Sequence, residues 1–347
     1  MRFFKFSYVL ALLAMSCLWH SCAKENVGPQ AEAAAAGPIV APASQQQANP
    51  IEVVCGMLSF QNMDIFQSTL TDLETQTDIW EDDFVEANSH MTDEELNLFE
   101  EESGYSDEQA MIDFESQYDY QSLRSVLRAQ EEVWLDNEVL DEENDPNDHF
   151  IIDDYVQTLL NSEEEVMIEG SIYKFLESGA YYEITDGDCQ TLAGIKDGSI
   201  DPANAPNVII HIEENMEGIE RSEERCQTNK GIKDKITSGS YRIKWKLKIF
   251  NYPWQCGAKS KVISYKRKGW PKRWKRHRTT VEACLRATFC DRNHVLDPAL
   301  GTNGIKCSLR RRRSTHYKVT GPCRSKSGEI KGGHAGNGLL HISTLNF

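Results

Sequence analysis

Cationic and apolar side chains alternate along residues 241–249 of this chain. The cations are Arg242, Lys244, Lys246 and Lys248, and the residues between and around them are Tyr241, Ile243, Trp245, Leu247 and Ile249. Because successive side chains of a strand point to opposite faces, the pattern predicts a strand with one apolar and one cationic face. Such a row of cations suits a polyanion, since each phosphate or sulfate contact releases condensed counterions.

Two further basic tracts follow along the chain. The first, within residues 266–278, mixes cations with tryptophans: Lys266, Arg267, Lys268, Trp270, Lys272, Arg273 and Trp274. The second is the run Arg310, Arg311, Arg312 and Arg313. Because tryptophan faces stack on bases and sugar rings, we predict that these residues and the strand cations bind an anionic polymer. A glycan, a lipopolysaccharide or a nucleic acid would fit, and no metal or cofactor is expected.

The charges of the chain are segregated. Residues 1–229 hold 9 Lys and Arg against 49 Asp and Glu, a net charge of −40, whereas residues 230–347 hold 28 against 5, a net charge of +23. Such asymmetry indicates a charged partner. Three explanations are open. The acidic half could dock on the basic half and shield it, the basic half could hold an external polyanion, or the charge could serve solubility alone. Docked surface pairs are individually weak and salt-sensitive, but intramolecular linkage favours them.

Residues 1–22 have the features of an export signal. Arg2 and Lys5 precede an apolar run, residues 6–19, that is too short for a stable transmembrane helix. The run ends in Leu-Trp-His-Ser-Cys22, which resembles the relaxed lipobox of Bacteroidota lipoproteins, with Cys17 as a rival site. The resemblance implies lipidation of Cys22 and anchoring in the outer membrane of the cell envelope. Residues 23–26 resemble a surface-export tag, which implies outward display.

A flexible tether is expected at residues 23–50, which are rich in Ala, Gln and Pro. Residues 51–197 are predicted to form an acidic, mainly helical module. Helical periodicity covers residues 56–162, with capping boxes at Thr92 and Ser106. A β-hairpin turning at Glu169-Gly170 and a third strand near residues 181–184 follow. Residues 159–174 resemble a recurring helix–hairpin segment of uncharacterised Bacteroidota lipoproteins, a resemblance that carries no activity.

The second half is predicted to be β-structured. An acidic linker at residues 198–235 leads into a basic, disulfide-bonded β-domain at 236–347. Alternating runs at 279–289, 305–309, 315–319 and 338–346 indicate further strands, and the glycine-rich stretch 331–338 indicates a loop. The fold class is therefore α+β: an acidic helical module with a small β-hairpin, then an antiparallel β-sandwich or barrel-like domain.

The cysteines after Cys22 number eight, which in an exported chain predicts a disulfide framework. They are Cys55, Cys189, Cys226, Cys256, Cys284, Cys290, Cys307 and Cys323. We expect Cys55 and Cys189 to close the acidic half and the other six to belong with the basic half. Cys284 and Cys290 are too far apart on one strand to pair. Zinc binding by Cys284, Cys290 and His294 lacks the paired close spacings of structural sites.

No strong catalytic motif is present in the sequence: it contains no Gly-x-Ser-x-Gly, no His-Glu-x-x-His and no phosphate-cradling glycine loop. We therefore expect a non-enzymatic protein. One alternative is a metal-independent nuclease or toxin-like domain, which would draw a general acid and base from His294, His316, His334 and His341. Calcium binding by Asp145, Asn147 and Asp148, or by Asp197 and Asp201, does not fit the spaced loop of known sites.

Overall fold

The computed structural model describes residues 49–137, 139–211, 231–269, 273–287, 306–320, 329–336 and 339–346. Residues 49–347 form one compact unit. The predicted signal, Cys22 and nearly all of the predicted tether lie outside the described residues. Within the described ranges, no helix combines the length and the apolar character needed to cross a bilayer.

Helices dominate the acidic half, as its periodicity predicts. They are α1 (Met63–Ala87), α2 (Asp93–Ser103), α3 (Gln109–Glu115), α4 (Leu123–Leu135), the 3-10 turn η1 (Pro146–Asp148), α5 (Asp154–Leu159) and α6 (Cys189–Asp197). The predicted capping box of α2 is confirmed, since Thr92 and Glu95 satisfy each other's backbone N–H groups. The second predicted box is wrong. The Ser106 hydroxyl accepts from the Glu108 N–H instead, which closes a turn ahead of α3.

A six-stranded mixed sheet accompanies these helices. Its order is β1 (Ile51–Val54), β2 (Met57–Phe60), β3 (Glu165–Ile168), β4 (Ser171–Phe175), β5 (Tyr181–Ile184) and β6 (Val208–His211). The predicted hairpin at Glu169-Gly170 and its third strand are confirmed. Helix was wrongly predicted from residue 56, because Cys55 and Gly56 take positive φ and turn β1 into β2. Strand β6 extends this sheet into the predicted linker.

A disulfide joins Cys55, in the β1–β2 turn, to Cys189 at the start of α6, as predicted for the acidic half. Their Cα atoms are 6.3 Å apart, within the usual range. Cys284 is also disulfide-bonded. Only the backbone is described at Cys256 and Cys307, and the remaining predicted disulfide cysteines, Cys226, Cys290 and Cys323, lie outside the described residues.

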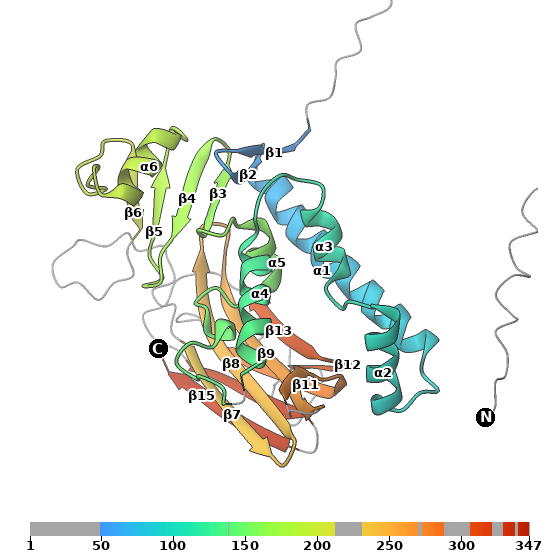
Figure 1. The fold of residues 1–347 in the computed structure, drawn as a ribbon. Helices are drawn as coiled ribbons and strands as arrows, with labels where there is room; N and C mark the ends of the chain where they lie inside the picture. The colour runs from blue at the N-terminus through green and yellow to red at the C-terminus, as the bar shows by residue number, and fades with distance from the viewer. Residues whose placement is uncertain are drawn as a thin grey trace, which may run out of the picture. The chain divides into compact units, whose positions relative to one another are not determined.

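Two antiparallel sheets make up the basic half (Figure 1). The first contains β7 (Gly231–Ser238), β8 (Tyr241–Tyr252), β9 (Gln255–Lys268), β10 (Arg273–Arg276) and β13 (Ser314–Thr320). The second contains β12 (Lys306–Arg312), β11 (Thr279–Ala287), β14 (Glu329–Gly336) and β15 (Leu339–Asn346). The α+β class is confirmed, and the described strands form open sheets rather than a closed barrel.

The predicted glycine-rich loop is a strand. Residues 329–336 form β14, which lies between β11 and β15. Gly332 and Gly333 sit opposite Leu285 and Cys284 of β11 in the register. The glycines predicted a loop by their turn propensity. The segment is a strand because its backbone pairs with β11 on one side and β15 on the other, and glycine in a strand often marks a close approach of backbones.

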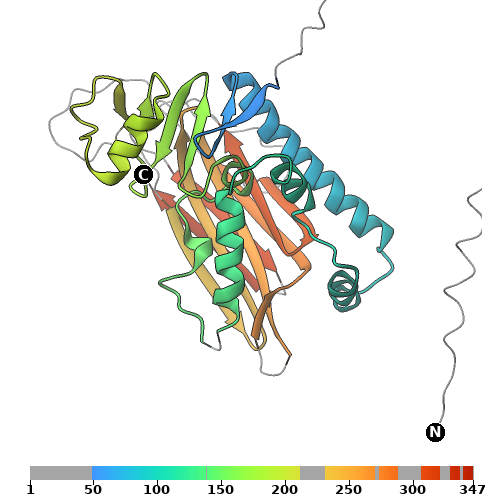
Figure 2. The ribbon, with the colours of Figure 1, turned by 45° about the horizontal axis from the view of Figure 1, so that its top comes forward.

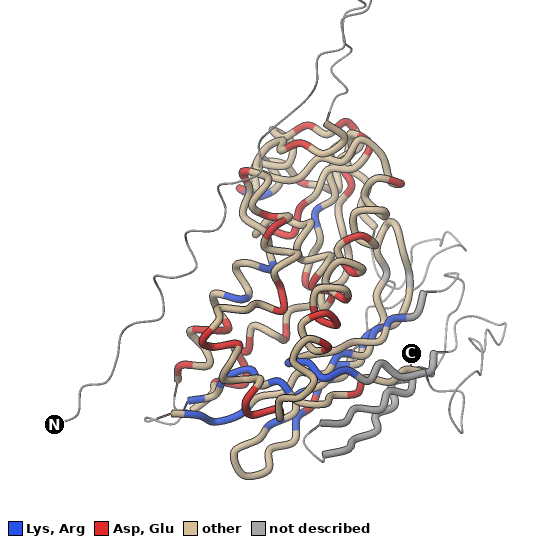
Figure 3. Tube along the Cα trace, turned by 90° about the vertical axis from the view of Figure 1, so that its right-hand side faces the viewer, with Lys and Arg blue, Asp and Glu red and all other residues tan. Residues whose placement is uncertain are grey.

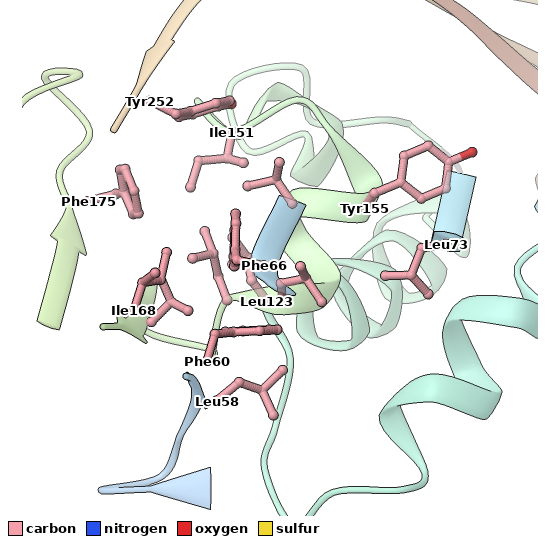
Figure 4. Packing of buried hydrophobic residues seen from close by; sticks show 14 of the residues in the cluster. Leu58, Phe60, Phe66, Leu73, Leu123, Ile151, Tyr155, Ile168, Phe175 and Tyr252 are labelled. Atoms are coloured by element: carbon pink, nitrogen blue, oxygen red, sulfur yellow. The ribbon is translucent and has the colours of Figure 1, made fainter. Parts of the chain in front are cut away.

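One hydrophobic core is shared by both halves of the sequence (Figure 4). Phe60, Phe66 and Phe175 come from the acidic half, while Tyr252 comes from the end of β8. Trp254, in the turn after β8, places its ring centroid 4.4 Å from that of Phe66. Because the β8–β9 hairpin supplies part of the core beneath the acidic helices, the two halves do not bury their apolar surface independently.

Strand β8 lies between two layers. Its apolar residues Ile243 and Trp245 pack against Val281 and Ala283 of β11, which joins the two antiparallel sheets face to face. Figures 1 and 2 show α4 and α5 lying over the other face of β8 and β9. The cationic face predicted for β8 is therefore directed toward the acidic helices.

Candidate functional site

The cationic face of β8 is buried rather than open to solvent. Arg242, Lys244 and Lys246 are all buried, and Lys246 is only 8% exposed. Removing an isolated charge from water is so costly that buried cations are normally paired or hydrogen-bonded. The acceptors here come from residues 142–150, the segment that joins α4 to α5.

Pairing along β8 changes from carboxylates to backbone carbonyls. Arg242 donates to Glu142 at 2.7 Å. Lys244 contacts Asp145 and, at 2.5 Å, Asp148. The Lys246 ammonium donates to the carbonyls of residues 147 and 149, at 2.6 and 3.1 Å, and the Lys248 ammonium donates to that of residue 150. The four predicted strand cations thus contact one acidic segment of the same chain.

The neighbouring strands repeat the arrangement with Lys259, Lys261 and Lys318, which the sequence analysis missed, and with His316, which it named only for the nuclease alternative. On β9, Lys259 lies 3.0 Å from Asp153 and Lys261 lies 2.7 Å from Asp154. On β13, His316 and Lys318 both contact Glu74 of α1, at 3.1 and 3.3 Å. The sequence signal was the alternation of residues 258–262, where two lysines flank a serine between apolar residues.

The predicted tract at residues 266–278 is divided between the same interface and the surface. Lys266 pairs with Glu94 at 2.5 Å and Lys268 with Glu101 at 3.5 Å. Arg273 pairs with Asp136 at 2.8 Å, but both side chains are largely exposed. Trp270 and Lys272 lie outside the described residues.

Trp274 does not present its ring to solvent. It packs in a buried cluster with Trp134, Leu135 and Tyr265, and the Arg267 guanidinium lies 5.7 Å from the centroid of its ring. The ring is therefore part of the interface between α4 and the β9–β10 hairpin. In this conformation it is not placed to stack on a base or a sugar.

The arginine run at residues 310–313 reaches toward α1 and α2. Arg311 donates to Asp93 at 2.6 Å, Arg312 to Asp78 at 2.6 Å, and Arg313 to Glu100 at 3.0 Å. Arg310 is half-buried on β12. Arg276 and Arg278, just before β11, also enter this interface: Arg276 lies 2.8 Å from Glu131, and Arg278 lies 2.8 Å from Glu81.

Burial and pairing shift the ionisation of this face. Burial acts to raise the pKa of Glu131, but the guanidinium groups of Arg276 and Arg128 outweigh it and lower that pKa to about 2. Lys246 shows the opposite balance, since burial lowers its pKa to about 7 although Asp148 opposes the change. The Glu131 carboxyl group is thus stabilised as an anion, whereas burial prevails at Glu100, whose pKa is raised, and at Lys246.

Figure 3 shows the result along the chain: Asp and Glu follow the helices, whereas Lys and Arg follow the strands beneath them. We call this contact the charged interface. It consists of the cations of β8, β9, β12 and β13, with Arg276 and Arg278, and the carboxylates of α1, α2, α4 and residues 142–154. Its chemistry is the mutual neutralisation of two oppositely charged surfaces.

The residues of the catalytic and metal alternatives are placed as follows. His334 of β14 lies opposite His341 of β15 in the register, and His294 lies outside the described residues. Asp145 and Asp148 contact lysines, whereas Asp197 and Asp201 accept backbone N–H groups of their own turns. In the described parts of the chain, no three His, Cys, Asp or Glu side chains are grouped to hold a metal ion.

Comparison with known proteins adds little. No model of a known protein family matches the sequence. No curated protein matches it either. Among solved structures, a DUF4848 family protein from Bacteroides thetaiotaomicron aligns with 12% identity over 86% of this chain and 100% of that chain, with a TM-score of 0.21. At this TM-score the alignment supports no inference about fold or function.

Proposed function

We propose that this chain is a non-enzymatic, lipid-anchored protein of the cell envelope, displayed outward, whose cationic sheet is occupied by its own acidic helices. In this state the sheet is a latent surface for anionic polymers, and binding of such polymers is left to the exposed cations at its rim. The charged interface is the observation that supports this proposal, because it covers most of those cations of the basic half whose side chains are described.

The energetics of the interface favour coverage of the cationic sheet by the acidic helices of the same chain over binding of an external polymer. Exposed pairs contribute little and buried pairs must offset their desolvation, but the acidic helices and the sheet belong to one chain and share one hydrophobic core. An external polymer would have to displace carboxylates that are already in place and already desolvated. Such displacement costs more than contact with an open basic surface.

Exposed cations remain at the edge of the first basic sheet. The side chains of Arg273 and Lys275 on β10 are 45% and 59% exposed. They lie on one side of a short strand, since residues two apart on a strand share a face. On the opposite edge of this sheet, Lys233 and Lys235 of β7 are 53% and 38% exposed. Of the described cations, a polyanion that binds at the β10 edge in the closed state would therefore contact Arg273 and Lys275.

The first prediction concerns salt dependence. Residues 23–347 are expected to bind duplex DNA and heparin weakly, with a slope of log affinity against log salt of roughly −2 for DNA, because about two phosphates are contacted. Fluorescence anisotropy between low and moderate salt measures this slope. Lys275→Gln should flatten it by about one unit, whereas the control Lys196→Gln, on α6 of the acidic half, should not.

A slope of roughly −4 or steeper would contradict a site limited to the β10 edge, because cations beyond Arg273 and Lys275 would then have to contact DNA. Tight binding that Lys275→Gln leaves unchanged would do the same. Either result would restore the simpler view of an open basic surface.

A second prediction tests the anchor. Cells that express the full chain and grow with an alkyne-tagged fatty acid should label the protein through Cys22. Cys22→Ala should abolish the label and leave the protein in the soluble fraction, while Cys17→Ala should label like the wild type. Equal labelling of both variants would remove Cys22 as the required acceptor, and no labelling of the full chain would withdraw the anchor.

A further inference from the structure

A cleft opens where the pairing of β8 changes from carboxylates to carbonyls. Its volume is about 730 Å³, and it lies between the hairpin β3–β4, the segment around residue 149 and the strands β7 and β8. Lysines 174, 233, 246 and 248 line it together with the rings of Phe150 and Phe175. Ligand sites for small molecules typically have volumes of a few hundred to about 1,000 Å³. The cleft is therefore of a suitable size.

Lys246 stands in the middle of a cross-strand row of lysines. In the antiparallel register it lies opposite Lys233 of β7 on one side and opposite Lys261 of β9 on the other. Like charges directly opposite one another on neighbouring strands are destabilising. The row therefore needs anions near it.

The two outer lysines of this row have close carboxylates, and the central one does not. Lys233 lies 2.5 Å from Asp148, and Lys261 lies 2.7 Å from Asp154. For Lys246, the nearest carboxylate among the described residues is also Asp148, at 3.7 Å, and its hydrogen bonds go to two carbonyls. An anion in the cleft would supply the missing charge.

Aromatic rings complete the lining. The Lys248 ammonium lies 5.7 Å from the centroid of the Phe150 ring, and Phe175 lines the cleft from β4. Apolar ring faces beside a cation recognise a ligand that carries an anionic group on a ring. The lining also contains Asp148, Glu164 and Glu177, which disfavour a long polyanion that would pass all of them.

We propose that this cleft binds a small organic anion that bears a ring, with its anionic group on Lys246 and its ring against Phe150. A sulfated or uronic sugar unit and a nucleoside monophosphate share this chemistry. The site is separate from the rim residues Arg273 and Lys275, so it does not depend on the function proposed above.

Calorimetric titration of residues 23–347 tests the site with three probes: a heparin-derived disaccharide, adenosine monophosphate and inorganic phosphate. We expect saturable binding of at least one ring-bearing probe, and weaker binding of phosphate. Lys246→Met should weaken binding at least about tenfold, since a hydrogen bond to a charged group is lost. The control Lys235→Met removes a lysine of β7 that does not line the cleft, and it should bind like the wild type.

Proton uptake provides a readout that a purely structural role would not change. Burial lowers the pKa of Lys246 to about 7, so an anion that binds beside it at pH 8 should draw a proton onto it. Titrations in two buffers of different ionisation enthalpy measure this uptake, which Lys246→Met should remove. The charged groups around Lys246 are Lys233 of β7, Lys244 and Lys248 of β8, Lys261 of β9 and Asp148 of η1.

If Lys246→Met fails to fold, Phe150→Leu serves instead, because it removes the ring and keeps the charge. It should weaken the ring-bearing probes and leave phosphate binding unchanged. The disaccharide arm and the nucleotide arm distinguish the two sources of the ligand. The absence of saturable binding by all three probes, or binding that neither variant weakens, would overturn the proposal.

Discussion

Replacing Arg278 by Met is expected to lower the free energy of unfolding by about 3–5 kcal/mol, because the change leaves buried carboxylates without their cation. The Arg278 side chain is 0% exposed. It donates to Glu81 at 2.8 and 3.1 Å and to Glu100, and both of these carboxylates are buried. Urea denaturation at pH 7 measures the change.

The surroundings of Arg278 explain why this residue has the largest predicted effect among the cations. Its guanidinium also donates to the carbonyl of Arg311 at 2.7 Å and lies over the ring of Phe84 at 5.3 Å. Burial acts to lower its pKa, but the hydrogen bond and charge of Glu81 and the charges of Glu100 and Asp107 raise it overall. The cation is thus held charged in a site that water does not reach.

Arg273→Met is the matched control. It removes the same functional group from a pair with Asp136 in which both side chains are largely exposed. Exposed pairs contribute about 0–1 kcal/mol, so the control should remain close to the wild type. Equal losses for the two variants would mean that burial of the pair does not decide its contribution, and the account of the charged interface would be wrong.

Acidification from pH 5 to pH 2 is expected to unfold the protein through the charged interface. The folded state lowers the pKa of Glu131 to about 2 and the pKa values of Asp153 and Asp154 below their usual range, in each case because cations outweigh burial. A carboxyl group with a lowered pKa stabilises the fold above its unfolded pKa. That stability is lost as the pH falls toward the folded pKa.

Glu131 alone accounts for about 3 kcal/mol of this loss, since its pKa falls from 4.5 to about 2 and each unit is worth about 1.4 kcal/mol. Urea denaturation at intervals between pH 7 and pH 3 should therefore show stability that falls steeply below about pH 4.5. Glu131→Gln should lower stability at pH 7 and make the curve flatter below pH 4.5. Glu132→Gln, an exposed neighbour on α4, serves as the control. A curve of the same steepness for both variants would remove Glu131 from this explanation.

Helices and strands were predictable where the apolar side chains of a segment recur at a single spacing, either that of a helix or that of a strand. The alternation of residues 241–249 identified β8, and the turn at Glu169-Gly170 identified the hairpin β3–β4. Elements that depend on a distant neighbour were missed. Strand β14 is rich in glycine, and it is a strand because β11 and β15 pair with its backbone. The short strands β1 and β2 depend in the same way on β3.

The candidate site shows the same division. The sequence correctly indicated that residues 242, 244, 246 and 248 share one face of a strand, because strand geometry has a period of two. It could not indicate what covers that face, because Lys244 meets Asp145 across 99 residues of chain. Likewise, the Trp274 pattern predicted a stacking platform, but the ring is buried against Trp134 of α4.

The sequence by itself determined the segregation of charge, the alternating faces of β8, the helical acidic half and the pairing of Cys55 with Cys189. These properties follow from residue counts, from local periodicity and from the small number of cysteines in one half. Only the tertiary structure decided that the cationic face lies against the acidic helices. It also decided that Lys246 borders a cleft and that its nearest described carboxylate, Asp148, is 3.7 Å away. Long-range packing of a shared apolar core brings those surfaces together, and no local pattern encodes which surfaces will meet.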